Sequence, residues 1–316
     1  MFDPRQEFEL LAEAYEKSGG QLDALRDAQV GSLVVSLNKI LAKNEIPGLL
    51  IEGQETASGV RARITVKQGT VIERPVHLCF GVLPKEGVQE VVAEFVIEDQ
   101  AKATFLAHCS FPNAVSVRHL MQGTVRVGKG AAMTYNETHF HGDEGGVEVL
   151  PVMRVEVAEG GEFRSEFKLT QGAAGRVEID YEVRVGDHGL CELYAKVYGK
   201  QNDSIRVKES IYLDGGGARG LAKSRIVVTD RAESEVVGEI VGNGPSSRGH
   251  VDCVEIVQGK QARASAVPML RVVDETAKLT HEAAIGSVDK KQVETLMARG
   301  LTESEAVEVV VQGLLR

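Results

Sequence analysis

The stretch Gly175-Arg-Val-Glu-Ile-Asp-Tyr-Glu-Val-Arg-Val185 alternates strictly between polar and apolar side chains after its first residue. Successive residues of a β-strand point to opposite faces, so this period of two predicts a strand with one buried face. Part of the stretch 224–228 alternates in the same way. Together with abundant Val and Gly and few aromatic residues, the pattern predicts many short strands between about Gly31 and Ser287.

Small residues that directly follow turn signals recur at a nearly fixed interval through this region. The gaps between them are 31, 30, 30, 14, 14, 29, 14, 30 and 15 positions, close to one or two units of about 15. Such a period predicts a mainly β fold, a right-handed parallel β-helix in which one coil of about 29–30 residues holds two or more strands. A β-sandwich is the alternative, but it would need more hairpin turns such as Asn-Gly. The residues are Thr70, Ala101, Ala131, Gly161, Gly175, Gly189, Ala218, Ala232, Ala262 and Ala277.

Both ends of the chain carry helical patterns. Asp3 is expected to cap a helix that starts at Pro4, because Pro is favoured at the first helical position. Near the other end, Asp289 opens one predicted helix, and the capping box from Thr302 to Glu305 opens another. Three segments follow from these patterns: a helical segment over 1–30, a β-helix core over 31–287 and a helical segment over 288–316.

Composition excludes several classes of protein. The 316 residues include 36 Lys and Arg against 46 Asp and Glu, a net charge of −10 without a basic block, so nucleic acid is not an expected partner. No apolar run approaches the roughly 20 residues that span a bilayer, so neither a membrane protein nor a secreted one is expected. The four cysteines form no C-x-x-C pair and are predicted to be free thiols in the cytoplasm. The sequence also lacks a P-loop, so this chain should bind no nucleotide itself.

The coil length predicts which distant residues become neighbours. The offsets from Cys253 to His281 and to Glu282 are 28 and 29 positions, so each pair is one coil apart. Cys79 and Cys109 are 30 positions apart and could stack in the same way. Cys109 and Cys253 differ by 144 positions, close to five coils, which would place both on one face.

Several motifs in order carry a family resemblance. They are Asn44-Glu-Ile-Pro-Gly48, Ala107-His-Cys-Ser-Phe-Pro112, Gly249-His-Val-Asp-Cys253, Thr280-His-Glu-Ala283 and Leu296-Met-Ala-Arg-Gly-Leu-Thr-Glu303. With them the chain resembles the SufB/SufD family, the scaffold subunits of the SUF iron–sulfur cluster assembly system. Its short front, which has no cysteine cluster, is similar to the compact chains of minimal systems, in which one gene product can replace both subunits. The resemblance implies a parallel β-helix with helical ends.

The resemblance also implies roles for particular residues. Cys253 and Glu282 match SufB-type cluster or acceptor positions, His281 matches a histidine of SufD-type subunits, and Cys109 matches a cysteine that receives sulfur inside the helix. A transient iron–sulfur cluster would then be held by Cys253, His281 and Glu282. One chain offers too few of these ligands to enclose a cluster, whereas two copies across a two-fold axis offer a full set.

The partners implied are a second copy of the chain, a SufC-type ABC ATPase, and a cysteine desulfurase or another sulfur donor. The chain itself would be a scaffold and not an enzyme. The helical end would dock the ATPase, although its apolar stripe could equally be part of the chain's own core. The stripe consists of Leu296, Met297, Val307, Val310, Val311 and Leu314.

Simpler interpretations remain for several residues. Cys109 could be an ordinary buried thiol, and Cys79 and Cys191 are expected in the core. His139 and His141, followed by Asp143 and Glu144, form a rival metal site, but the neighbouring glycines favour a solvated loop.

Two other functions are compatible with a β-helix: a carbohydrate-active enzyme and a pure interaction module. The absence of Trp argues against sugar binding, and a glycan-hydrolysis assay would test it. The interaction module would be favoured if anaerobic reconstitution with iron and sulfide gave no cluster absorption.

Overall fold

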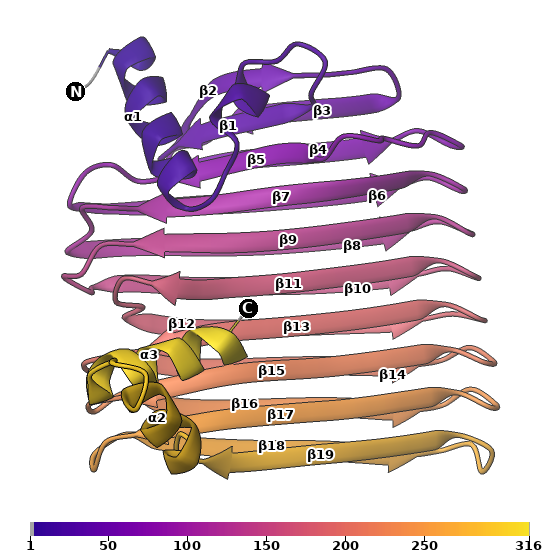
Figure 1. Cartoon of the computed structure of the whole chain (residues 1–316). Helices are drawn as coiled ribbons and strands as arrows, with labels where there is room; N and C mark the ends of the chain where they lie inside the picture. Colours follow the sequence, from indigo (N-terminus) through magenta and orange to yellow (C-terminus); the bar gives the residue numbers. More distant parts are fainter. Residues whose placement is uncertain (1–2, 316) are drawn as a thin grey trace.

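A computed structural model describes residues 3–315 and shows a parallel β-solenoid with helices at both ends (Figure 1). In chain order, its strands are β1 (Ser32–Ser36), β2 (Lys39–Asn44), β3 (Leu49–Glu55), β4 (Gly59–Val66), β5 (Val76–Gly81), β6 (Glu86–Ile97), β7 (Lys102–Phe111), β8 (Ser116–Val127), β9 (Ala132–His141), β10 (Val147–Val157), β11 (Glu162–Gln171), β12 (Arg176–Val185), β13 (Leu190–Gly199), β14 (Ser204–Leu213), β15 (Arg219–Thr229), β16 (Glu233–Gly242), β17 (Arg248–Gln258), β18 (Arg263–Val272) and β19 (Lys278–Gly286). The predicted solenoid is confirmed.

The strands form two facing sheets. Sheet A has the order β19-β17-β15-β13-β11-β9-β7-β5-β1-β2, and sheet B has the order β18-β16-β14-β12-β10-β8-β6-β4-β3. In Figure 1 the strands of sheet A other than β2 run in one direction, and the strands of sheet B other than β3 run in the opposite direction. Each coil contributes one strand to each sheet, so the described chain winds through eight coils from β4 to β19.

The pairing register confirms the predicted coil length. Residues stacked on adjacent coils are between 28 and 31 positions apart, as in Arg176 over Ser204 and Gly59 over Glu90. Pairing between coils is parallel throughout, whereas the antiparallel pairs β1–β2 and β3–β4 close the N-terminal end of the described stack.

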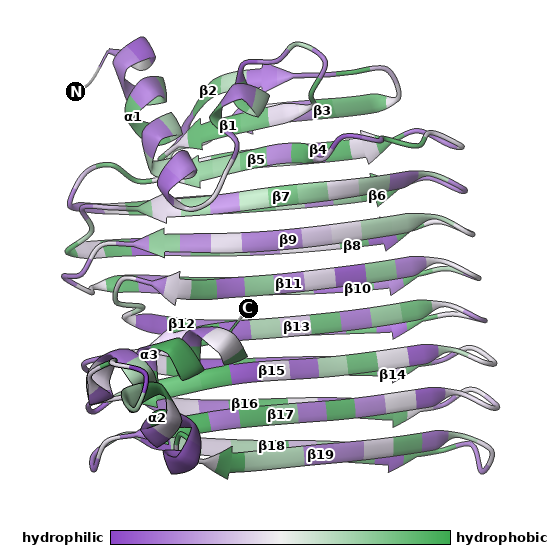
Figure 2. Ribbon diagram, in the orientation of Figure 1, coloured by the Kyte–Doolittle hydropathy of each residue, from purple (hydrophilic) through white to green (hydrophobic). Residues whose placement is uncertain are grey.

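Alternation along the strands fills the space between the sheets with apolar side chains, and Figure 2 shows hydrophobic and hydrophilic residues alternating along them. The small residues that revealed the period lie at the corners of the coils. Ala101, Ala131, Ala218 and Ala232 are at most 1% exposed where a new strand is about to begin. A larger side chain would have no room at these corners, which is why the turn signals recur with small residues.

The helices are α1 (Pro4–Lys17), a short 3-10 helix (Leu22–Leu25), α2 (Lys290–Met297) and α3 (Glu303–Leu314). As predicted, α1 starts at Pro4, Asp289 caps α2 with its side chain, and Thr302 and Glu305 form the capping box of α3. Asp3 occupies the N-cap position of α1 as predicted, but its side chain makes no capping hydrogen bond. No helix in residues 3–315 combines the length and the apolar character needed to cross a lipid bilayer.

The helices pack on the outer face of sheet A, near its two ends (Figure 1). The last coil, formed by β18 and β19, has a neighbouring coil on one side only, and the helices do not cover its open side. Its side chains are accordingly exposed or half-buried, unlike those of the coils beneath it.

Candidate functional site

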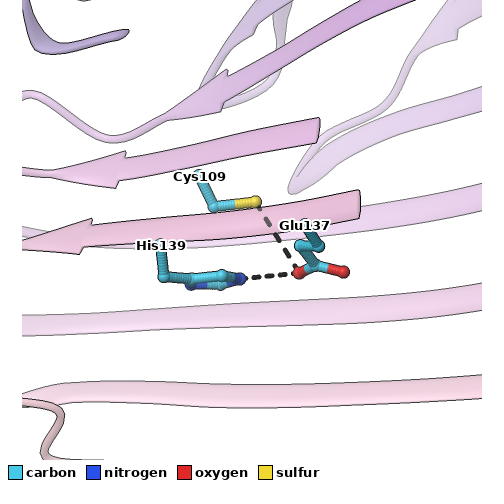
Figure 3. Close-up of side chains that lie close together, drawn as sticks. All are labelled: Cys109, Glu137 and His139. Carbon is cyan, nitrogen blue, oxygen red and sulfur yellow. Dashed lines mark hydrogen bonds and ion pairs between the residues drawn. The ribbon is translucent and has the colours of Figure 1, made fainter. Parts of the chain in front are cut away.

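A group of three potential metal ligands lies inside the solenoid. Cys109 on β7 pairs with His139 on β9, and Glu137 precedes His139 by two residues on the same inward face. Glu137 Oε1 lies 2.6 Å from His139 Nε2 and 3.9 Å from Cys109 Sγ. Figure 3 shows the Glu137 carboxylate between the sulfur and the imidazole ring. All three residues are at most 1% exposed.

The protons of this group can be assigned from its contacts. The carbonyl oxygen of Ala173 can only accept, so His141 Nδ1, 3.2 Å away, must donate to it. Neutral His141 then has its acceptor at Nε2, which lies 3.4 Å from His139 Nδ1 and takes the proton of that nitrogen. The pKa of both histidines is lowered to about 3, mainly by burial, so both rings are neutral. His139 therefore turns an unprotonated Nε2 toward Glu137.

An unprotonated nitrogen and a carboxylate oxygen would repel each other at this distance. Glu137 must therefore either hold a proton or share a bound cation with His139. Burial raises the pKa of Glu137 to about 7, although the Tyr135 hydroxyl and the Cys109 thiol act in the opposite direction. Its second oxygen, Oε2, has no hydrogen-bond partner. Burial also raises the pKa of Cys109 well above its usual range. Below about pH 7 the group is thus neutral when nothing positive is bound.

Across the interior, His119 on β8 offers two further nitrogens. Neither of them has a hydrogen-bond partner, and the ring centroid lies 5.8 Å from that of His139. Burial is the main cause that lowers the pKa of His119 well below its usual range. Buried imidazoles without partners are uncommon in folded proteins.

The sequence-based interpretation of this region needs correction. His139 and His141 were expected in a solvated loop, yet both are buried on β9. Only Asp143 and Glu144, in the turn that follows, are exposed. The glycines mark that turn and not the strand before it. Glu137 was missed altogether, but a step of one coil forward from Cys109 leads to His139, and that signal was present in the sequence.

The second predicted group lies at the other end of sheet A. Cys253 on β17 is 2% exposed and faces inward, and burial raises its pKa. On β19, Ala283 pairs with Cys253, whereas His281 pairs with Val251 and Glu282 with Asp252. His281 therefore shares the inward face with Cys253, and Glu282 lies on the outer face. Within residues 3–315, three ligand atoms gather closely only at Cys109, Glu137 and His139.

The remaining cysteines are core residues, as expected. Cys191 is inside the solenoid, and Cys79 packs under α1 on the outer face of sheet A. The expected stacking of Cys79 on Cys109 is wrong, because Cys79 pairs with His108 and Cys109 with Phe80. All four thiols are free.

Cys109 and Cys253 do share the inward face of sheet A, five coils apart. At about 4.8 Å per rung, roughly 24 Å separate the two positions. They cannot bind one ion or one small cluster together within a chain.

The apolar stripe of the C-terminal helices is largely covered by the chain itself. Val311 is fully buried, and it packs with Tyr198 and Val227 of sheet A. Leu296, Val307, Val310 and Leu314 are partly buried against the same cluster. Met297 remains 42% exposed.

Comparisons with known proteins identify the family. The family model described as "SUF system FeS cluster assembly, SufBD core domain" matches residues 86–314. The iron–sulfur cluster assembly SufBD family protein of Methanocaldococcus jannaschii is 38% identical over 283 residues, which cover 90% of this chain and 89% of that protein. A SufBD family protein of Pyrococcus horikoshii is 36% identical over 311 residues, which cover 98% of this chain and 94% of that protein. The chain therefore belongs to the SufBD family of iron–sulfur cluster assembly proteins.

Proposed function

We propose that the protein is a non-enzymatic scaffold for de novo iron–sulfur cluster assembly and that it works as a homodimer joined through the last coil. Family membership supports the first part. The observation that carries the second is the uncovered last coil, which lies one rung beyond Cys253.

The last coil has the properties of an interface. Both of its strands leave backbone donors and acceptors unpaired along one edge, and such edges readily pair with another chain. Large apolar side chains add to this surface. Val267, Met269, Val272, Val273 and Ile285 are between 39% and 61% exposed. A two-fold axis through this end would bring the edge strands of two copies together in antiparallel fashion.

The dimer would complete the ligand set that one copy leaves scattered. Cys253 and His281 face the same interior, and Glu282 lies on the outer side of β19. Cys253, His281 and Glu282 from two copies would meet at this seam and hold a transient cluster as cargo. Sulfur would arrive from a cysteine desulfurase or another donor, with Cys109 and Cys253 as acceptors. Four free thiols are compatible with work in a reducing cytoplasm.

A SufC-type ABC ATPase would dock on α2 and α3. Because Val311 belongs to the chain's own core, the docking surface is its exposed surroundings, with Met297 at its centre and Leu296, Val307, Val310 and Leu314 at its edge. A shallow depression between the helices, lined in part by Gln292, Leu296 and Val310, would receive a partner side chain.

Anaerobic reconstitution with iron and sulfide tests the scaffold. Visible cluster absorption is expected from the parent protein, and Cys253→Ser should abolish it. Cys191→Ser is the matched control, because Cys191 is equally buried but lies in the middle of the stack. Absorption that survives Cys253→Ser would refute the proposed cluster position.

A pulldown tests the ATPase. Met297→Glu should prevent capture of a SufC-type ATPase, whereas Val88→Glu, an equally exposed valine on sheet B, should not. Equal capture by both variants would show that the ATPase does not dock at Met297.

A further inference from the structure

We propose that the interior group of Cys109, Glu137 and His139 binds a single divalent first-row transition-metal ion, Fe²⁺ or Zn²⁺. This site goes beyond the scaffold function, because it is distinct from the last coil. Glu137 and Cys253 lie in one inward row of sheet A, four coils apart, which is about 19 Å.

The donor set selects the class of ion. A thiolate, an imidazole and a carboxylate together suit zinc or ferrous iron, whereas Mg²⁺ and Ca²⁺ prefer oxygen ligands only. Around a tetrahedral ion, such donors lie about 3.3–3.6 Å from one another. The present separations from Glu137 Oε1, 3.9 Å to sulfur and 2.6 Å to nitrogen, bracket that range. A shift of the Glu137 carboxylate by less than the width of an atom would equalise them.

The arrangement of protons also favours a cation. The chain of contacts from Ala173 through His141 leaves His139 Nε2 unprotonated, opposite a carboxylate oxygen. Two acceptors at this distance repel each other unless a positive centre lies between them. A metal ion would replace the proton that Glu137 otherwise has to keep.

The surroundings resemble the outer sphere of a metal site. A metal-binding histidine usually donates its other N–H to a second group, which fixes the ring orientation. His139 donates to His141, and His141 donates to the Ala173 carbonyl. His119, with both nitrogens free of partners, packs edge-on against the His139 ring at a centroid distance of 5.8 Å, outside the group of three ligands.

We place the entry of the ion on the side of sheet B. A small void beside Glu137, with room for about one water molecule, is lined by Tyr135, Tyr181 and Gly123. Gly123 also lines a groove on the outside of sheet B. Next to it, Pro151 has no N–H and is left out of the ladder between β10 and β12. The missing pairs at Leu150 and Pro151 leave a gap in that ladder, whereas the ladder between β8 and β10 is unbroken.

Anaerobic titration with Co²⁺ tests the site, because a cobalt-bound thiolate gives a charge-transfer band in the near ultraviolet. The full chain carries Cys253→Ser, so that the thiol near the last coil cannot contribute. We expect a single equivalent of Co²⁺ to bind, Zn²⁺ and Fe²⁺ to compete for the site, and Mg²⁺ to have no effect.

Three ligand-region variants sharpen the test in the same background. Cys109→Ser should remove the charge-transfer band, and Glu137→Gln should weaken binding at least about tenfold. His141→Leu, which leaves all three ligands in place, should weaken binding by about 10–100-fold. Cys191→Ser is the matched control, since Cys191 is also buried in the interior but lies away from the group. Circular dichroism shows which variants are folded, and only folded ones are compared.

The proposal is overturned if the Cys253→Ser protein binds no Co²⁺, or if folded Cys109→Ser retains the band. No sulfide is present in this experiment, so failure of the metal site leaves the scaffold function untouched.

Discussion

Glu209 is a carboxyl group buried inside the solenoid, on β14 and only 3% exposed. Burial raises its pKa from the ordinary value of 4.5 to about 8. The native protein therefore keeps this proton up to about pH 8, whereas the unfolded chain releases it near 4.5. Between these values unfolding releases a proton, so a rise in pH favours the unfolded state.

Glu209→Gln removes a group that must otherwise take up a proton on folding at pH values between about 4.5 and 8. The free energy of unfolding of the variant should exceed that of the parent by an amount that grows between about pH 5 and pH 9 and reaches a few kcal/mol. Urea denaturation across this range measures the difference. Glu233→Gln, on the surface of β16, is the control and should show no such trend. A constant difference at all pH values would contradict the buried-proton explanation.

At the scale of residues, spacing identified neighbouring coils but not the face on which a side chain lies. Cys79 and Cys109 are 30 positions apart, but β5 and β7 pair with an offset of 29, so the two thiols lie on opposite faces. Cys253 and Glu282 are 29 positions apart, but their strands pair with an offset of 30. A slip of one position reverses the face, and the pairing offsets between coils vary from 28 to 31. A constant period therefore cannot specify a ligand set.

At the scale of elements, the docking of α1 depends on a glycine in the strand beneath it. A Cβ atom at Gly81 on β5 would overlap Leu11 Cδ1 and lie 3.0 Å from the carbonyl oxygen of Ser110. Leu11 is fully buried and cannot swing away without leaving its cluster. The absence of a side chain at Gly81 thus allows the helix to approach sheet A closely.

Gly81→Ala should therefore loosen α1 and cost about 1–3 kcal/mol, as overpacking does. Hydrogen exchange should show reduced protection over Pro4–Lys17, with the solenoid amides unchanged. Gly123→Ala is the matched control, and its effect on stability should have the opposite sign. The nearest atoms to its new Cβ lie 3.5–3.8 Å away, and the backbone there is unstrained. It should stabilise the protein by about 0.4–1 kcal/mol. Equal protection of α1 in both variants would show that Gly81 does not control the docking.

Helix starts could be predicted where their signals are local. Asp289 and the Thr302–Glu305 box cap through contacts within three residues, so short-range sequence is sufficient. What each helix packs against is a long-range property. From the sequence alone, Val311 fits a core position and a docking surface equally well. Its packing with Tyr198 and Val227 in the structure shows that it is a core residue.

At the scale of the whole molecule, the fold was the most predictable property. Each coil has the same two strands and tight corners, so small corner residues such as Ala101 and Ala131 recur along the chain and make the period detectable. The two ends of the solenoid do not follow this repeat. A coil is stabilised by a neighbour on each side, and the last coil has only one.

This asymmetry leads to a prediction about assembly. Ile285 on β19 is 48% exposed at the open end, while Leu50 on β3 is 42% exposed at the closed end. If the open end joins two copies, Ile285→Asp places a charge in a desolvated seam and should shift the protein from dimer to monomer, whereas Leu50→Asp should leave the dimer intact. Sedimentation velocity distinguishes these outcomes at equal protein concentration. Since the cluster ligands would come from both copies, the monomeric variant should also fail to hold a cluster with Cys253, His281 and Glu282 unaltered. A monomeric parent protein would refute the proposed dimer. A dimer that survives Ile285→Asp and dissociates with Leu50→Asp would place the interface at the other end and separate it from Cys253.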